Sequence, residues 1–150
     1  LRLVGHSAGG HLVSRMLCDD RFGKNVFSRI DRVIAISGLN DLRPLLHTKM
    51  NKVLKLDLGE AESESSVFGI PKNIPMICWV GGQERPEFLR QTQLLVKAWK
   101  IYIDVIQMEV APQHDHFKIV EQLAEPQSPV LLSIIEPLKK MIEINQMDQK

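Results

Sequence analysis

The sequence predicts an α/β fold in which helices cover both faces of a mostly parallel sheet. Four short, mainly apolar segments, at 2–4, 32–37, 75–82 and 102–110, alternate with segments of helical or mixed character. Uninterrupted apolar segments of this length are typical of strands that are buried on both sides. Because strands that alternate with helices favour parallel pairing, the 150 residues are expected to form a single partial domain, 1–150.

Turn-forming residues follow three of these strands. The first strand is followed by Gly5, the second by Gly38 and Asn40, and the third ends at Gly81 and Gly82. Glycine and asparagine are common at such points because they adopt turn conformations readily. The sequence therefore predicts tight turns at the carboxyl ends of the strands, where parallel sheets carry their sites.

Helices are expected between and after the strands. Apolar residues recur at helical spacing over 9–17. A second helix is expected over 86–100, because a proline in its first turn loses no hydrogen bond. A short helix over 117–123 and a longer one over 130–144, which Pro137 kinks or splits, complete the chain.

The segment between the second and third strands is less regular. One or two short helices are expected within 41–56. The polar stretch 60–66, which lacks apolar periodicity, is interpreted as a solvated helix end or a loop.

The composition is that of an ordinary globular domain. Hydrophobic residues make up 44% of the chain, charged residues 25%, and the net charge is +1. This balance gives no electrostatic reason to expect a nucleic acid partner, and no apolar run is long enough to span a membrane. The two cysteines, Cys18 and Cys78, are far apart and are interpreted as small core residues, which fits a cytoplasmic setting.

The first turn of the chain carries the strongest functional signal. Gly5-His6-Ser7-Ala8-Gly9 matches the pattern G-x-S-x-G between a strand and a helix, which is the setting of a nucleophilic serine. Such a turn strains the serine backbone and exposes its hydroxyl, and a Cβ atom at either flanking glycine is expected to clash. Ser7 is therefore predicted to be the nucleophile, and the N–H of Ala8 to bind a developing oxyanion.

A nucleophilic serine needs a general base, which follows the acid in the chain order that accompanies this pattern. His47 precedes the strand expected to carry the acid, whereas His114 and His116 lie in the loop after the last strand. His116 is the predicted base because the ring of Phe117 can anchor it against the following helix. His114 is the alternative.

The acid is expected in the loop that follows the third strand. Glu84 lies within that loop, whereas Glu87 falls in the first helical turn, where a carboxylate is favourable to the helix dipole. Glu84 is therefore the predicted acid. Asp41 is the alternative, because it follows the second strand in the same way.

The remaining histidines near the turn, His6 and His11, are interpreted as structural. No pair of histidines shares a metal-ligand spacing such as H-E-x-x-H with a carboxylate. Neither a metal nor an organic cofactor is therefore expected.

Four segments, GHSAGGHL, SGLNDLRPLL, ERPEFLRQ and HDHFKIVEQL, together resemble the kynurenine formamidase (arylformamidase) and small-esterase group of α/β-hydrolases. The resemblance runs from Leu1 to about Leu123 and implies the α/β-hydrolase fold. It places the nucleophile of the family on Ser7, its base on His116 and its acid on Glu84. Many members of the family have aspartate at the acid position.

The resemblance implies a serine hydrolase that converts N-formyl-kynurenine to kynurenine and formate, a step of tryptophan breakdown, through an acyl-enzyme. A carboxylesterase of small esters is the alternative, and a non-catalytic or truncated member of the fold is a third. A small-molecule substrate is expected, with no nucleic acid or membrane partner, and a homodimer of the full-length protein is compatible with this reading.

Two features of α/β-hydrolases precede the nucleophile and do not occur in these 150 residues: a His-Gly-Gly-type loop with the second oxyanion donor, and further strands. We therefore expect the chain to be the C-terminal part of a larger protein whose N-terminal strands are missing. The edge of the first strand is then expected to be exposed, and the isolated chain to be poorly soluble.

Overall fold

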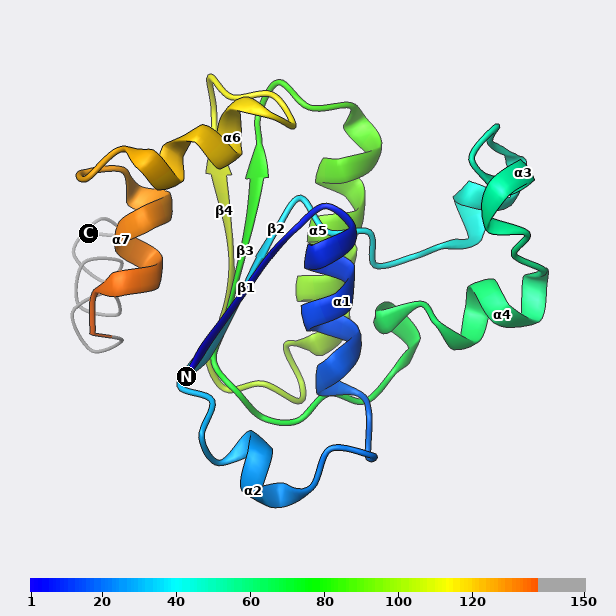
Figure 1. Cartoon of the computed structure of the whole chain (residues 1–150), viewed down its shortest axis with the longest axis horizontal. Helices are drawn as coiled ribbons and strands as arrows, with labels where there is room; N and C mark the ends of the chain where they lie inside the picture. The colour runs from blue at the N-terminus through cyan, green and yellow to red at the C-terminus, as the bar shows by residue number, and fades with distance from the viewer. Residues whose placement is uncertain (138–150) are drawn as a thin grey trace.

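The computed structural model describes residues 1–137. In this part of the chain four strands form one sheet, with the bounds β1 (Arg2–His6), β2 (Arg32–Ile36), β3 (Met76–Gly81) and β4 (Ile106–Ala111). They lie in the order β1-β2-β3-β4, and each neighbouring pair is parallel. Their carboxyl ends therefore meet at the same edge of the sheet, the upper edge in Figure 1. The predicted mostly parallel sheet with flanking helices is confirmed.

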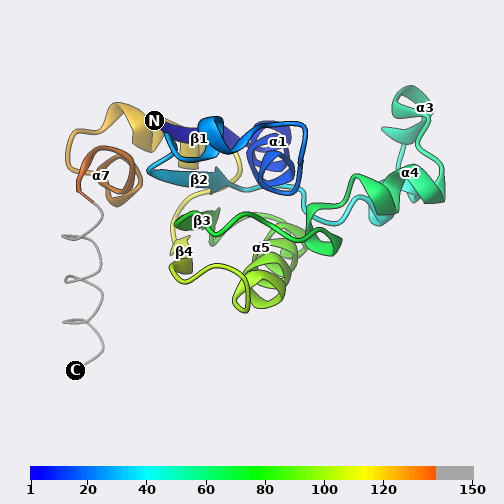
Figure 2. The same cartoon turned by 90° about the horizontal axis from the view of Figure 1, so that it is seen from below.

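Helices cover both faces of this sheet (Figures 1 and 2). One face carries the two long helices, α1 (Ala8–Leu17) and α5 (Pro86–Trp99). The other face carries α6 (Lys118–Glu121), the 3-10 helix η3 (Gln122–Ala124) and α7 (Pro129–Ile135). The edge of the sheet at which the carboxyl ends of the strands meet thus lies between two layers of helices.

Shorter helices lie outside these layers. The helix α2 (Lys24–Phe27) lies beyond the amino ends of the strands, and the sequence did not predict it. Between β2 and β3 the chain forms short helices that project away from the sheet in Figure 2, namely η1 (Arg43–His47), α3 (Asn51–Leu54) and α4 (Leu58–Ser63). The 3-10 helix η2 (Ser66–Phe68) follows them and packs against α1 and α5. The predicted short helices of 41–56 correspond to η1 and α3. The stretch 60–66 begins as the exposed end of α4, as expected, but its last residues, Ser65 and Ser66, are buried where the chain enters η2.

The core consists of two clusters, one on each face of the sheet. Alternate residues of the central strands point to opposite faces. Val33 and Cys78 pack with α1 and α5, whereas Ile34 and Trp79 pack with α6 and α7. Every residue of β2 and β3 is buried, which explains why both strands appear as uninterrupted apolar runs in the sequence.

The contact between β1 and α1 requires glycine at one position. A Cβ atom added to Gly5 would lie 2.0 Å from the carbonyl oxygen of Gly9. The expected clash at the second flanking position is wrong, because a Cβ added to Gly9 has no neighbouring atom within 4 Å. The second close approach is one residue further on, where a Cβ on Gly10 would lie 2.8 Å from the Cα of Gly38.

Two element boundaries differ from the sequence prediction. The fourth strand begins at Ile106 rather than at Tyr102, because Tyr102 and Ile103 extend the end of α5 through hydrogen bonds to the carbonyl of Trp99. The last helix begins one residue early and ends at Ile135, and the extended residue that follows it precedes Pro137. The remainder of the predicted helix over 130–144 lies outside the described residues from 138 onward.

No helix within residues 1–137 combines the length and apolar character that crossing a membrane requires.

The glycine contacts predict opposite effects of two alanine substitutions. Gly5→Ala is expected to lower the free energy of unfolding by more than about 3 kcal/mol, because the methyl group meets backbone atoms that cannot rotate away. Gly9→Ala, its matched control within the same motif, is expected to leave stability unchanged or raise it by up to about 1 kcal/mol. Denaturant titration of the two variants checks this, and equal losses would contradict it.

Candidate active site

The turn between β1 and α1 carries Ser7. Its backbone has φ 55° and ψ −115°, and positive φ is a region that residues other than glycine seldom adopt. The N–H of Ser7 donates to the carbonyl of Ile36 on β2 (2.9 Å), and its own carbonyl accepts from the N–H of His11 (3.0 Å). Ala8 is the first residue of α1, so its N–H has no partner within the helix and lies next to the serine.

Two further side chains predicted from the sequence lie at this edge. His116 comes from the loop between β4 and α6, and Glu84 comes from the loop between β3 and α5. The hydroxyl oxygen of Ser7 lies 3.0 Å from Nε2 of His116. On the other side of the ring, Nδ1 lies 2.6 Å from Oε2 of Glu84. The hydroxyl can donate to the ring and the ring to the carboxylate, which is the arrangement of a nucleophile, a base and an orienting acid.

The carboxylate of Glu84 is buried and well supplied with donors. Its side chain is 0% exposed, against 20% for His116. Oε1 accepts hydrogen bonds from the hydroxyl of Ser37 (2.5 Å) and from the N–H of Gly81 (2.8 Å). A buried carboxylate is tolerated only with such partners. Ser37 was not identified as a site residue from the sequence. The sequence feature that could have identified it is its position directly after β2, the strand that pairs with β1.

Aromatic rings enclose His116 on several sides. The ring centroids of His6 and Phe88 lie 4.6 Å and 4.4 Å from that of His116, and both rings are tilted against it. Phe117 meets the imidazole edge-on at 5.4 Å and is itself 75% exposed. The ring that the sequence suggested as an anchor therefore makes the more distant contact, and His6 and Phe88 make the closer ones.

The loop that carries His116 is held by hydrogen bonds at its backbone. Nε2–H of His6 donates to the carbonyl of His116 (2.8 Å), and burial lowers the pKa of His6. The carboxylate of Asp115 accepts from the N–H groups of Phe117 and Lys118 at 2.9 Å each, and these donors lower its pKa. His6, interpreted from the sequence as structural, thus links β1 to the loop of the candidate base.

The alternative acid, Asp41, has different partners. Its carboxylate accepts two hydrogen bonds of 3.0 Å from Arg43 and lies 3.7 Å from the guanidinium of Arg90. Hydrogen bonds from Arg43 hold the pKa of Asp41 below its ordinary value. Glu87 pairs with Arg90 at 2.6 Å. Of the three carboxylates weighed from the sequence, the described structure places Glu84 against His116.

A buried glutamine joins two of the segments that carried the family resemblance. Oε1 of Gln91 accepts from the N–H groups of Asn40 (2.6 Å) and Asp41 (2.9 Å). Its Nε2 donates to the carbonyl of Asp41 and to the carboxylate of Glu87, both at 2.9 Å. The segments SGLNDLRPLL and ERPEFLRQ therefore form one polar network beside the site.

The other histidines have separate surroundings. His114, the alternative base, uses its carbonyl to accept the N–H of Gln83 (3.0 Å), and its Nδ1 is buried without a partner among residues 1–137. His11 donates to the carbonyl of Leu39 (2.9 Å), and burial lowers its pKa. His47 lies exposed at the end of η1. The structure does not bring these three side chains into the hydrogen-bonded chain of Ser7.

The sequence predicts that Cys18 and Cys78 are core residues and that the chain has no metal site. Burial raises the pKa of Cys18 to about 11 and that of Cys78 to about 12, so both remain thiols at neutral pH. Within residues 1–137 no cluster of three or more His, Cys, Asp or Glu side chains could hold a metal ion.

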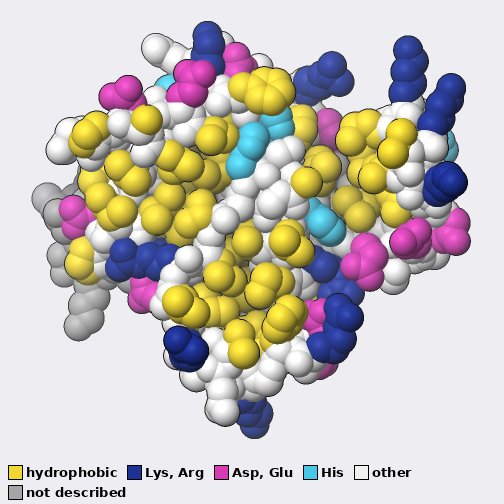
Figure 3. Space-filling model, in the orientation of Figure 1, with side chains coloured by type: hydrophobic (Ala, Val, Ile, Leu, Met, Phe, Trp, Pro, Cys, Tyr) yellow, Lys and Arg dark blue, Asp and Glu magenta, His cyan; other side chains and the backbone are white. Residues whose placement is uncertain are grey.

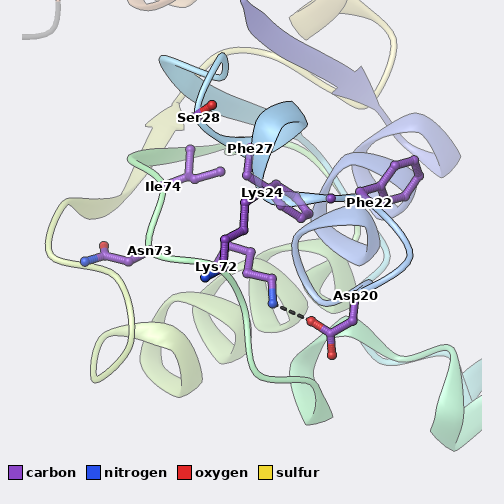
Figure 4. A pocket seen from close by; sticks show the side chains of 9 residues that line it. Asp20, Phe22, Lys24, Phe27, Ser28, Lys72, Asn73 and Ile74 are labelled. Carbon is purple, nitrogen blue, oxygen red and sulfur yellow. Dashed lines mark hydrogen bonds and ion pairs between the residues drawn. The ribbon is translucent and has the colours of Figure 1, made fainter.

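The surface around the candidate site is apolar. Figure 3 shows histidine and hydrophobic side chains together at the upper edge of the molecule, where the strands end. A separate cavity of about 550 Å³ lies at the opposite edge of the sheet, between the segment 20–28 and the residues 72–74 that precede β3 (Figure 4). Lys72 pairs there with Asp20. This cavity is remote from the strand ends that carry Ser7 and Glu84.

Comparison with known proteins identifies curated proteins of similar sequence and solved structures of similar fold. No family model matches the chain. Kynurenine formamidase of Salmo salar is 33% identical over 132 residues, which cover 83% of this chain and 45% of the relative, and that of Danio rerio is 32% identical over 131 residues with the same coverage. The chain thus spans about half the length of the curated relatives it matches.

Solved structures give the same fold. A protein of Silicibacter sp. TM1040, described as a candidate thioesterase, is 44% identical with a TM-score of 0.74, over 88% of this chain and 48% of that chain. Esterase B of Lactobacillus rhamnosis shares the fold with a TM-score of 0.62 at 18% identity, over 99% of this chain and 55% of that chain.

The parallel sheet, its helical layers and these neighbours give the chain the α/β-hydrolase fold. The curated relatives point to a narrower class of protein than the fold does. Over 83% of its length the chain is similar to curated kynurenine formamidases, at 32–33% identity.

The ion pairs of Asp41 predict how stability depends on pH. Asp41→Asn is expected to lower the free energy of unfolding near neutral pH by about 1–3 kcal/mol, because the guanidinium of Arg43 loses its charged partner. The pKa of Asp41 in the folded chain lies below 3.8, so this stabilisation is present above about pH 4 and is lost as the pH falls through the lowered pKa.

Denaturant titrations of the unmodified protein and of the Asp41→Asn variant between pH 3 and pH 7 check this prediction. Their difference in unfolding free energy should be constant above about pH 5 and should shrink below about pH 4. A difference that grows as the pH falls would contradict it.

Proposed function

We propose that the chain provides the catalytic triad of a serine hydrolase, with Ser7 as nucleophile, His116 as general base and Glu84 as the orienting acid. The observation that carries this proposal is the continuous set of hydrogen bonds from the Ser7 hydroxyl through His116 to Glu84. Hydrolase relatives at 32–33% identity support it. No metal or organic cofactor takes part in the proposed reaction.

The proposed reaction begins with attack on a carbonyl carbon. Nε2 of His116 accepts the proton of Ser7 as the serine oxygen bonds to that carbon, and the N–H of Ala8 donates to the oxyanion that forms. Nε2–H of His116 then gives its proton to the leaving nitrogen or oxygen as that bond breaks, which leaves an acyl ester on Ser7. Water, deprotonated by His116, hydrolyses the ester and regenerates the serine.

The substrate that we propose is a small aryl formamide, N-formyl-kynurenine. Attack on its formyl group would release kynurenine with a neutral aniline NH₂ group and leave a formyl ester on Ser7, and hydrolysis would then release formate. The names of the relatives from Salmo salar and Danio rerio support this choice. The cytoplasmic location and the homodimer of the full-length protein stay predictions.

An esterase that acts on small esters or thioesters is the second candidate. The observation that favours it is the Silicibacter protein described as a candidate thioesterase, which at 44% identity is more similar to this chain than the two formamidases are. The same three side chains would perform either reaction, because only the leaving atom differs.

Comparison of two substrates tests the proposed activity. The full-length protein is expected to hydrolyse N-formyl-kynurenine faster than a short-chain aryl ester, and Ser7→Ala is expected to lower both rates by about 10⁴-fold or more, because no other group replaces the nucleophile. Initial rates from product absorbance give the comparison. Serine-dependent turnover of the ester alone would support the second candidate, and serine-independent turnover would contradict both.

The assignment of the acid has its own test. Glu84→Gln is expected to lower kcat by about 10³–10⁴-fold, because the amide cannot stabilise the imidazolium that forms on His116. Asp41→Asn, the control at the alternative position, is expected to lower kcat by less than about 10-fold. Steady-state kinetics at neutral pH, where both variants are checked for folding by circular dichroism, decide between them. A larger loss for Asp41→Asn would overturn the assignment.

A further inference from the structure

We propose that Ser37 is a positioning residue for the acid of the candidate triad. Its hydroxyl holds one oxygen of the Glu84 carboxylate, so that the other oxygen is presented to His116. This inference rests on the proposed serine hydrolase function and extends it to a residue outside the triad.

The two oxygens of Glu84 have different partners. Oε1 accepts from the hydroxyl of Ser37 at 2.5 Å and from the N–H of Gly81 at 2.8 Å. Oε2 lies 2.6 Å from Nδ1 of His116. Two donors from two different strand ends therefore fix the plane of the carboxylate, and the remaining oxygen can accept only from the side on which the imidazole lies.

Ser37 shares with Ser7 a positive φ, which residues other than glycine seldom adopt. Ser37 has φ 51° and Ser7 has φ 55°. Because His6 pairs with Ile36 in the sheet, the two serines occupy equivalent positions, one residue past the ends of adjacent strands. Strained backbone of this kind persists where the surrounding structure holds it in place, and it is concentrated at functional sites.

Sheet hydrogen bonds hold both serines in these conformations. The N–H of Ser7 donates to the carbonyl of Ile36, and the N–H of Ser37 donates to the carbonyl of Trp79 at 2.8 Å. The ladder thus continues one residue beyond each strand, and the side chain of Ser37 lies buried with 0% exposure. The carboxylate of Glu84 accepts a hydrogen bond from a hydroxyl that is shielded from water.

The length of the acid gives this contact its importance. Glutamate has one more rotatable bond than aspartate, so a glutamate acid has more conformational freedom to lose when it is held against a histidine. The hydroxyl of Ser37 and the N–H of Gly81 restrict that freedom before substrate binds. Positioning of this kind affects rate more than substrate binding, since a small misplacement of a catalytic group can cost about 10²-fold.

Ser37→Gly tests the inference, because glycine adopts φ near 51° without strain and lacks only the side chain. We expect kcat to fall by about 10- to 100-fold, with KM changed by less than about 2-fold. In proton NMR spectra of the free full-length protein, labelled with ¹⁵N-histidine, we expect the downfield signal of the His116 Nδ1 proton to move or broaden away.

Lys55→Gly is the matched control. Lys55 also has a positive φ, 55°, and lies exposed after α3, so its replacement by glycine changes a positive-φ residue without touching the site. We expect both kcat and the Nδ1 proton signal to be unchanged in this variant. Ser37→Cys is the second variant if Ser37→Gly does not fold. It keeps nearly the volume of serine with a weaker donor, and its effects on kcat and on the proton signal should have the same direction.

The NMR signal separates this inference from the proposed function, because it needs no substrate. Loss of the signal in folded Ser37→Gly or Ser37→Cys, but not in Lys55→Gly, supports the positioning role even if neither the formamide nor the ester is hydrolysed. A folded Ser37 variant with an unchanged signal and unchanged kcat would overturn it. So would a change in melting temperature with both of these readouts unaltered.

Discussion

The candidate site depends on parallel pairing in one register. Because β1, β2 and β3 all run in the same direction, their carboxyl ends meet at one edge and bring together Ser7, Ser37 and Gly81. An antiparallel neighbour would carry its end to the opposite edge, some 15–20 Å away for strands of five or six residues. The separation of these residues along the sequence therefore has little influence on their distance in space.

Close packing between α1 and the sheet gives the serine turn its shape. The carbonyl of Gly9 occupies the space that a side chain at Gly5 would fill, and Gly10 meets Gly38 at the end of the neighbouring strand. Helix and strand can approach this closely only without side chains between them. The turn that strains Ser7 is thus a consequence of packing as well as of local backbone preference.

Charged and polar contacts then keep the loops of the site in place. Gln91 joins the exit of β2 to α5, and His6 joins β1 to the loop of the candidate base. Each contact links an element of the sheet edge to a segment at least fifty residues away in the sequence. The loops that carry Glu84 and His116 are in this way fixed relative to the strand that carries Ser7.

The sequence by itself determined the parallel α/β fold, since the buried strands β2 and β3 are continuous apolar runs. The G-x-S-x-G motif with its flanking strand and helix likewise predicted Ser7 as the nucleophile. The order of loops along the chain favoured Glu84 over Asp41 and the loop that carries both His114 and His116, whereas the neighbouring Phe117 favoured His116. These signals are local, because the spacing of apolar residues and the residue types at turns depend only on residues that are close together in the sequence. Tertiary structure alone decided that Ser37 holds the carboxylate, that His6 binds the carbonyl of His116 and that Gln91 binds the N–H groups of Asn40 and Asp41. Contacts across strands depend on register and layer packing, which no single segment of the sequence encodes.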